Sequence, residues 1–96
     1  MYISGPISGM PIELAKDIFA SASKEIESAG HIPVNPFDSG LDDSAAWQEH
    51  MKADLRMMLD CDAIHMLPGW EHSRGATIEK GLASALGFKI IEFGKL

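Results

Sequence analysis

Segments with strand character and segments with helical periodicity alternate along the entire chain, and this alternation limits the possible folds more than any other sequence feature. Short β-prone or apolar runs occur at Met1–Ile3, His31–Val34, Ala63–Leu67 and Lys89–Phe93. Between them lie three segments with helical spacing, at 11–29, 44–59 and 73–86. Strands that alternate with helices in this way form a parallel sheet with right-handed crossovers.

Each helical segment carries apolar residues on one face. In the first segment these are Ala15, Ile18, Phe19, Ala22, Ile26 and Ala29. The second segment, with Ser44 as its expected N-cap, carries Trp47, Met51, Leu55 and Met58, a stripe typical of core or of a subunit interface. The third carries Ile78, Leu82, Ala83 and Leu86. We therefore predict a single α/β domain over residues 1–96. Its expected form is a three-layer Rossmann- or flavodoxin-like sandwich with about four parallel strands in the order βαβαβαβ.

Composition and charge exclude several classes of function. The formal net charge is −6 and the eight basic residues are scattered, whereas binding to a nucleic-acid polymer requires clustered Lys and Arg. No apolar stretch approaches the roughly 20 residues of a membrane span, and the chain shows no basic-then-apolar leader. Cys61 is the only cysteine, so no intrachain disulfide can form. We expect a cytoplasmic protein that binds neither membrane nor nucleic-acid polymer.

The turn Ser4-Gly5-Pro6-Ile7-Ser8-Gly9 joins the first predicted strand to the first predicted helix. Ligands of open α/β sheets bind beyond the carboxyl ends of the strands, where this turn lies. Glycines permit close approach, and free N–H groups near a helix start attract anions. The turn matches neither the dinucleotide fingerprint nor the lysine-containing phosphate loop, so a tight connection without a ligand is the alternative interpretation.

Two carboxylates are candidates for chemistry. Glu79 lies among the apolar positions of the third helical segment, three and four residues before Leu82 and Ala83. A carboxylate on an apolar face is costly to bury unless it is hydrogen-bonded or performs a task. Asp54 follows Met51 by three residues in the second segment. Two carboxylates that face one pocket are what glycosidic bond cleavage requires, although a solvated position is the ordinary alternative for either residue.

The segment 69–75 places further polar groups at the expected ligand edge. Arg74 meets the start of the third helix between Ser73 and Gly75, where a guanidinium can pair with phosphate. Trp70, in the same loop, can stack on a base or cover the core. The four histidines show no metal-ligand spacing, so we expect no metal and no cofactor.

Three motifs together resemble the nucleoside 2-deoxyribosyltransferase superfamily, which includes the deoxynucleoside monophosphate N-glycosidases. They are Tyr2-Ile3-Ser4-Gly5-Pro6-Ile7-Ser8-Gly9, the pair Asp54-Leu55 ahead of Cys61-Asp62-Ala63-Ile64, and Gly75-Ala76-Thr77-Ile78-Glu79-Lys80-Gly81-Leu82-Ala83. The resemblance spans nearly the whole chain. Its most specific part is the pattern Gly-x-x-x-Glu-x-Gly-x-Ala in the last motif.

The resemblance implies roles for these residues. Glu79 corresponds to the nucleophile of the superfamily, Asp54 to the residue that contacts the sugar or assists proton transfer, and Tyr2 to an aromatic residue of the first strand. In the phosphate-using branch the turn holds the 5′-phosphate, which suggests Ser4, Gly5, Ile7, Ser8 and Gly9. That branch often carries an Arg in the turn; this chain has none, and Arg74 is the expected substitute.

The resemblance therefore predicts an N-glycosidase or deoxyribosyltransferase that acts on a small deoxynucleoside or its monophosphate. Its members assemble, so a homodimer or higher oligomer through the second helical segment is expected. Two alternatives remain open: a non-catalytic domain that senses or sequesters nucleotides, and a structural protein that uses the Met/Trp stripe as an interface.

Overall fold

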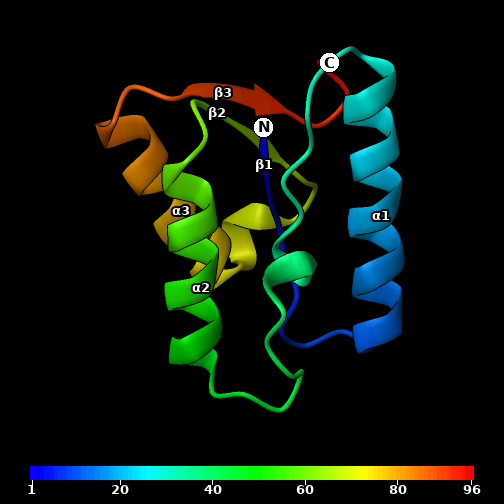
Figure 1. The fold of residues 1–96 in the computed structure, drawn as a ribbon, viewed down its shortest axis with the longest axis vertical. Helices are drawn as coiled ribbons and strands as arrows, with labels where there is room; N and C mark the ends of the chain where they lie inside the picture. The colour runs from blue at the N-terminus through cyan, green and yellow to red at the C-terminus, as the bar shows by residue number, and fades with distance from the viewer.

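A computed structural model describes all residues, 1–96, and shows an α/β fold with a three-stranded parallel sheet, consistent with a Rossmann-like arrangement. The elements in chain order are β1 (Tyr2–Ser4), α1 (Ile12–Ser28), η1 (Pro36–Ser39), α2 (Trp47–Leu59), β2 (Ala63–Met66), η2 (Trp70–His72), α3 (Arg74–Ala85) and β3 (Lys89–Glu92). In Figure 1, α1 lies on one side of the strands and α2 and α3 lie on the other. No helix is both long enough and apolar enough to cross a membrane.

The sheet has the order β1-β2-β3, with Tyr2 beside Ile64 and Ile64 beside Ile90. The strand expected at 31–34 is reduced to a single parallel bridge between Val34 and Tyr2. Pro33 and Pro36 flank this bridge, and proline has no N–H to donate to a ladder, so the pairing cannot extend. Chain segments therefore lie on both sides of β1, and a topological switch point falls between β1 and β2.

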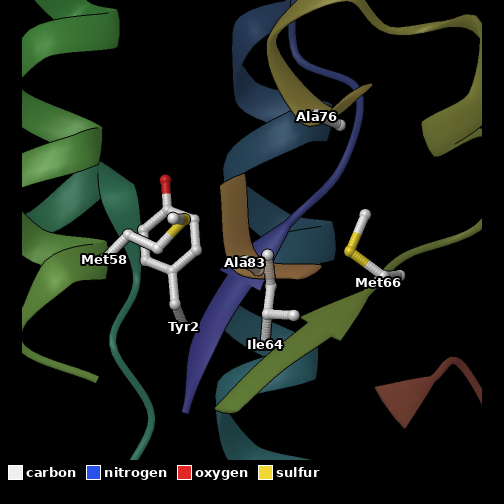
Figure 2. Packing of buried hydrophobic residues seen from close by; sticks show 6 residues of the cluster. All are labelled: Tyr2, Met58, Ile64, Met66, Ala76 and Ala83. Atoms are coloured by element: carbon white, nitrogen blue, oxygen red, sulfur yellow. The ribbon is translucent and has the colours of Figure 1, made fainter. Parts of the chain in front are cut away.

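Side chains of β1 alternate between two hydrophobic clusters. Tyr2 belongs to a cluster with Met58 of α2, Ile64 and Met66 of β2, and Ala76 and Ala83 of α3. Figure 2 shows these side chains, with the Tyr2 ring rising from β1 beside Met58. Ile3 belongs to a second cluster with Phe19, Ala22 and Ile26 of α1 and with Leu67. The helical periodicity of 11–29 thus predicts the buried face of α1, except that Ile18 and Ala29 are exposed.

The third helix corrects the sequence prediction in an informative way. Its buried residues are Ala76, Glu79 and Ala83, whereas Ile78 and Leu86 are 42% and 52% exposed. The two alanines allow α3 to lie close to the sheet, and this orientation turns Glu79 inward together with them. The helix is therefore oriented by a face of small residues and one carboxylate rather than by its largest apolar side chains.

The start of α2 also differs from the expectation. The N-cap is Ala46, which offers no side-chain cap, while the Ser44 hydroxyl donates to Asp42 at 2.6 Å within the preceding loop. Met51 and Met58 are buried within the chain, and Trp47 and Leu55 are half-buried. Packing inside the domain therefore accounts for the two methionines of the stripe, so they are not available to a subunit interface.

Candidate functional site

A cavity of about 600 Å³ lies beyond the carboxyl ends of the strands, where the fold predicts a ligand. Its walls come from the turn after β1, the segment around η1, the inner face of α2 and the start of α3. The predicted site residues among its lining are Gly5, Ile7, Ser8, Gly9, Asp54, Ser73, Arg74, Gly75 and Glu79. Residues that are distant along the chain are therefore brought to one cleft.

Glu79 is the most constrained polar residue of this cleft. It is only 4% exposed, and both of its carboxylate oxygens accept a hydrogen bond from β1. The Tyr2 hydroxyl donates to Oε2 at 2.6 Å, and the Ser4 hydroxyl donates to Oε1 at 2.7 Å. Tyr2 and Ser4 are two residues apart on a strand, so their side chains point to the same face of the sheet. Glu79 thus has a defined orientation at the floor of the cavity.

Burial and hydrogen bonding act in opposite directions on Glu79. Loss of solvent raises the pKa of its carboxyl group, while the hydrogen bonds from Tyr2 and Ser4 lower it, and the net change is upward. Burial, followed by the charge of Glu79, raises the pKa of the Tyr2 phenol well above its ordinary value. Tyr2 therefore remains a proton donor to the carboxylate over the physiological pH range.

Asp54 is the second carboxylate of the cavity. It lies half-buried on α2, and burial together with the charge of Glu79 raises its pKa to about 7. Near neutral pH a substantial fraction of Asp54 therefore carries a proton. Glu79 and Asp54 thus face one cleft from different environments, an arrangement that can divide the roles of acid and nucleophile between two carboxyl groups.

The glycine-rich turn forms one wall of the cavity through Gly5, Ile7, Ser8 and Gly9. A Cβ at Gly5 would lie 2.7 Å from the Cβ of Leu67, so the chain passes Leu67 too closely for any side chain. Gly9 has a φ of 88°, in the left-handed region that favours glycine. Ser4, predicted to contact phosphate, does not line the cavity; its hydroxyl is bonded to Glu79 instead.

The start of α3 supplies the cavity's cation. The Ser73 side chain caps the helix by accepting from the N–H of Ala76 at 3.3 Å. The Arg74 guanidinium carbon lies 4.3 Å from the centroid of the Trp47 ring, and Arg74 forms no ion pair with a carboxylate. Arg74 is therefore a cation at the cavity wall that is held only by an aromatic face.

The two tryptophans differ in their relation to the cavity, and for Trp70 the structure agrees with the second of the two interpretations, that it covers the core. Trp70 is not among the lining residues; it packs against the cluster around Tyr2, and the Lys80 ammonium lies 4.8 Å from its ring centroid. Trp47, which sequence reasoning assigned to packing, lines the cavity. The available signal was its place at the first turn of a helix that follows a loop, because such a position faces the ligand edge of the sheet.

Other cavity residues were not singled out from the sequence, among them Phe37, Asp43, His50 and His72. They come from the loop 35–44, from α2 and from η2, whose path over the sheet depends on tertiary packing. No group of three or more His, Cys, Asp or Glu side chains is placed to hold a metal ion.

Comparison with known proteins identifies a family for this chain but no curated relative. No curated protein matches the sequence. The family described as Domain of unknown function (DUF4406) matches residues 1–92, a range that includes all three strands, all three helices and every residue that lines the cavity. The chain therefore belongs to the DUF4406 family.

Proposed function

We propose that this protein cleaves the bond between base and sugar in a deoxynucleoside or its 5′-monophosphate, as an N-glycosidase or a deoxyribosyltransferase. One observation carries the proposal: a buried glutamate with both oxygens held by hydroxyl donors lies at the floor of a cavity that Asp54 also lines. This arrangement supplies an oriented anion and a proton donor to one ligand.

In the first step, an oxygen of the Glu79 carboxylate forms a bond to C1′ of the sugar. The bond from C1′ to the base nitrogen breaks, and its electron pair leaves with the base. The protonated Asp54 donates its proton to the departing base, which is reasonable because its pKa of about 7 leaves the acid form populated at neutral pH. The products of this step are the free base, ionised Asp54 and a sugar ester of Glu79.

In the second step, water or a second base attacks C1′. The bond between C1′ and the Glu79 oxygen breaks, and its electron pair restores the carboxylate. Asp54 accepts the proton that the attacking water or base loses, so both residues return to their starting states. Water gives hydrolysis and a second base gives transfer; the same residues serve both reactions.

The cavity walls suggest how the rest of the substrate is held. We propose that a 5′-phosphate lies near the turn of Gly5, Ser8 and Gly9 and pairs with the Arg74 guanidinium, because this is the cation of the lining. We propose that the base lies against Trp47 rather than Trp70, since only Trp47 lines the cavity.

At the level of the fold, we propose that the sheet and its helices are a short form of the three-layer flavodoxin-like sandwich, and that the family is related to the nucleoside 2-deoxyribosyltransferases. The switch point beside β1 and the place of Glu79 beyond the carboxyl ends of the strands support this relationship. We also propose that the protein forms a homodimer or a higher oligomer.

The test is a panel of deoxynucleosides and their 5′-monophosphates, each incubated with the protein and analysed for free base by chromatography. We expect release from at least one compound. The rate of base release by Glu79→Gln should be lower than that of wild type by about 10³-fold or more. The same ligand should still raise the melting temperature of this variant. Glu27→Gln, an exposed position on α1, is the matched control and should retain full activity.

The outcomes separate the catalytic proposal from its alternative. If a nucleotide raises the melting temperature but wild-type protein releases no base from any compound, the protein is a binding domain and the catalytic proposal is wrong. If Glu79→Gln releases base at the wild-type rate, Glu79 is not the nucleophile.

A further inference from the structure

The Ser4 hydroxyl, which donates to Glu79, has a different role from the phosphate contact that the family resemblance implies. We propose that Ser4 is a positioning residue for Glu79: its hydroxyl fixes one carboxylate oxygen while Tyr2 fixes the other, and together they keep the group ionised and oriented for attack. The catalytic consequence rests on the proposed function, whereas the effect on the carboxylate itself does not.

The position of Ser4 excludes direct contact with a ligand in the cavity. Ser4 is 1% exposed, does not line the cavity, and makes its side-chain hydrogen bond to Oε1 of Glu79. Its backbone carbonyl accepts from the N–H of Leu67 at 2.8 Å, which anchors the residue beside β2. A hydroxyl that is held this firmly beneath the cavity floor acts through the carboxylate it contacts.

The two hydroxyls match the ionised form of Glu79 and not its protonated form. A carboxylate accepts hydrogen bonds at both oxygens, and each of its oxygens here meets one donor. A protonated carboxyl group would direct its own O–H toward a hydroxyl that already donates, so one of the hydroxyls would have to turn away. In a site from which solvent is largely excluded, this complementarity opposes the tendency of burial to neutralise the acid.

The same arrangement serves the ester that the proposed reaction forms. One Glu79 oxygen is then bonded to C1′, and the other remains a carbonyl oxygen with its hydroxyl donor in place. When the bond to C1′ breaks, the returning electron pair spreads over both oxygens, and a donor already faces each of them. Neither hydroxyl needs to reorganise between the two steps.

The experiment compares Ser4→Ala and Ser4→Cys with the wild-type protein. Alanine removes the donor without adding volume, and cysteine keeps a weak S–H donor. Ser23→Ala is the matched control, because the Ser23 hydroxyl donates to the Phe19 carbonyl within α1, away from the cavity. Thermal unfolding of each variant establishes that it folds.

The primary readout is the titration of the Glu79 carboxyl carbon by NMR in protein labelled with ¹³C-glutamate, its signal identified by its absence in Glu79→Gln. We expect Glu79 to titrate at higher pH in Ser4→Ala than in wild type, with Ser4→Cys between them and Ser23→Ala unchanged. Equal titration of Glu79 in wild type and Ser4→Ala would overturn the proposal.

The second readout is the pH profile of kcat/KM for base release. Loss of a hydrogen bond to a charged group should lower kcat/KM of Ser4→Ala about tenfold on the acid side, with recovery toward wild type as the pH rises. A loss that is uniform across pH would indicate a merely structural role. Should wild-type protein cleave no nucleoside at all, the proposed function fails, and the NMR titration still decides the role of Ser4.

Discussion

Each face of the sheet buries an acid or a base, Glu79 on one face and His65 on the other, and the hydrogen-bond partners of these two side chains differ. On the face covered by α2 and α3, Glu79 has a hydroxyl donor on each oxygen. On the face covered by α1, His65 is fully buried, its Nδ1 lies 3.2 Å from the Ile91 carbonyl, and its Nε2 has no partner. A carbonyl only accepts, so Nδ1 carries the hydrogen and the unpartnered Nε2 is a neutral acceptor.

This difference shows which face is built to hold a charge. Partners that favour the ionised form surround Glu79, so charge can persist there despite burial. Burial lowers the pKa of His65, partly countered by its hydrogen bond to Ile91 and by the charges of Glu25 and Glu92, so the imidazole is neutral at physiological pH. The proposed chemistry therefore uses the face that holds Glu79, and His65 on the other face contributes to packing.

The largest effect expected in this comparison comes from removing Asp54, the proposed general acid on the face covered by α2 and α3. Asp54→Asn should lower kcat for base release by about 10² to 10⁴, the contribution of a positioned general acid. Wild-type activity should decline above about pH 7, where Asp54 loses its proton, and this decline should be absent in the variant. The pH–rate profiles of both proteins are the measurement. Asp62→Asn, at an exposed position, is the control, and an unchanged alkaline decline in Asp54→Asn would remove Asp54 from this role.

A second comparison concerns ligand affinity. Trp47→Ala should weaken the binding of a deoxynucleoside monophosphate about tenfold to a hundredfold, because stacking on an aromatic ring contributes about 1–3 kcal/mol per base. Trp70→Phe should leave the affinity unchanged, since Trp70 packs outside the cavity. Calorimetric titration of both variants is the measurement. Equal losses would contradict the assignment of the base to Trp47.

The glycine-rich turn lines the cavity and also contacts Leu67 on the other face of the sheet, so its packing can be tested through the free energy of unfolding. Gly5→Ala should reduce the free energy of unfolding by about 1–3 kcal/mol, because its Cβ would meet Leu67, a member of the cluster on the α1 face. Gly81→Ala is the matched control: it lies within α3 with open space around it, and should stabilise by up to about 1 kcal/mol. Urea unfolding monitors both, and a neutral Gly5→Ala would show that the turn can move away from Leu67.

The smallest effect expected concerns the free energy of unfolding, to which the ionisable groups of the two faces contribute with opposite pH dependence. Folding raises the pKa of Glu79 and Asp54, so their contribution to stability falls as pH rises, for Asp54 between about 4 and 7. Folding lowers the pKa of His65, so its contribution falls as pH drops below about 6.5. At pH 5, His65→Leu should therefore be more stable than wild type, and near pH 7.5 the two should be similar. Urea unfolding at both pH values checks this, with the exposed His31→Gln as control. A His65→Leu variant that is less stable at both pH values would contradict the packing role.

The sequence predicts the order of the elements well because that order depends on local periodicity. Phe19, Ala22 and Ile26 recur at helical spacing and are buried, and Ala63–Met66 is a continuous buried strand. The strand predicted at 31–34 is shorter in the structure, because its prolines limit pairing to the bridge between Val34 and Tyr2. The extent of this pairing depends on which chain segment lies beside it.

The site was less predictable because it depends on how the elements face one another. Glu79 stands out in the sequence as a carboxylate among apolar residues, and the structure buries it. Ser4 could not be separated from the glycine-rich turn, because strand alternation alone does not say that its face meets α3. The choice between Trp47 and Trp70 depends in the same way on the rotation of α2 against the sheet, which no periodicity of a single sequence determines.

The central claim is that Glu79 forms a covalent bond to the sugar, and mass spectrometry tests it most directly. The protein is analysed after brief reaction with a 2′-fluorinated deoxynucleoside or its 5′-monophosphate. This compound carries a base that the panel shows to be released. The fluorine destabilises the positive charge that develops on the sugar, which slows breakdown of the ester. Cleavage after Arg74 and Lys80 yields the peptide 75–80, which contains Glu79 as its sole carboxylate side chain. We predict that this peptide gains the mass of the fluorinated sugar. An adduct on any other peptide, or base release with peptide 75–80 unmodified throughout the reaction, would contradict the assignment of Glu79 as the nucleophile.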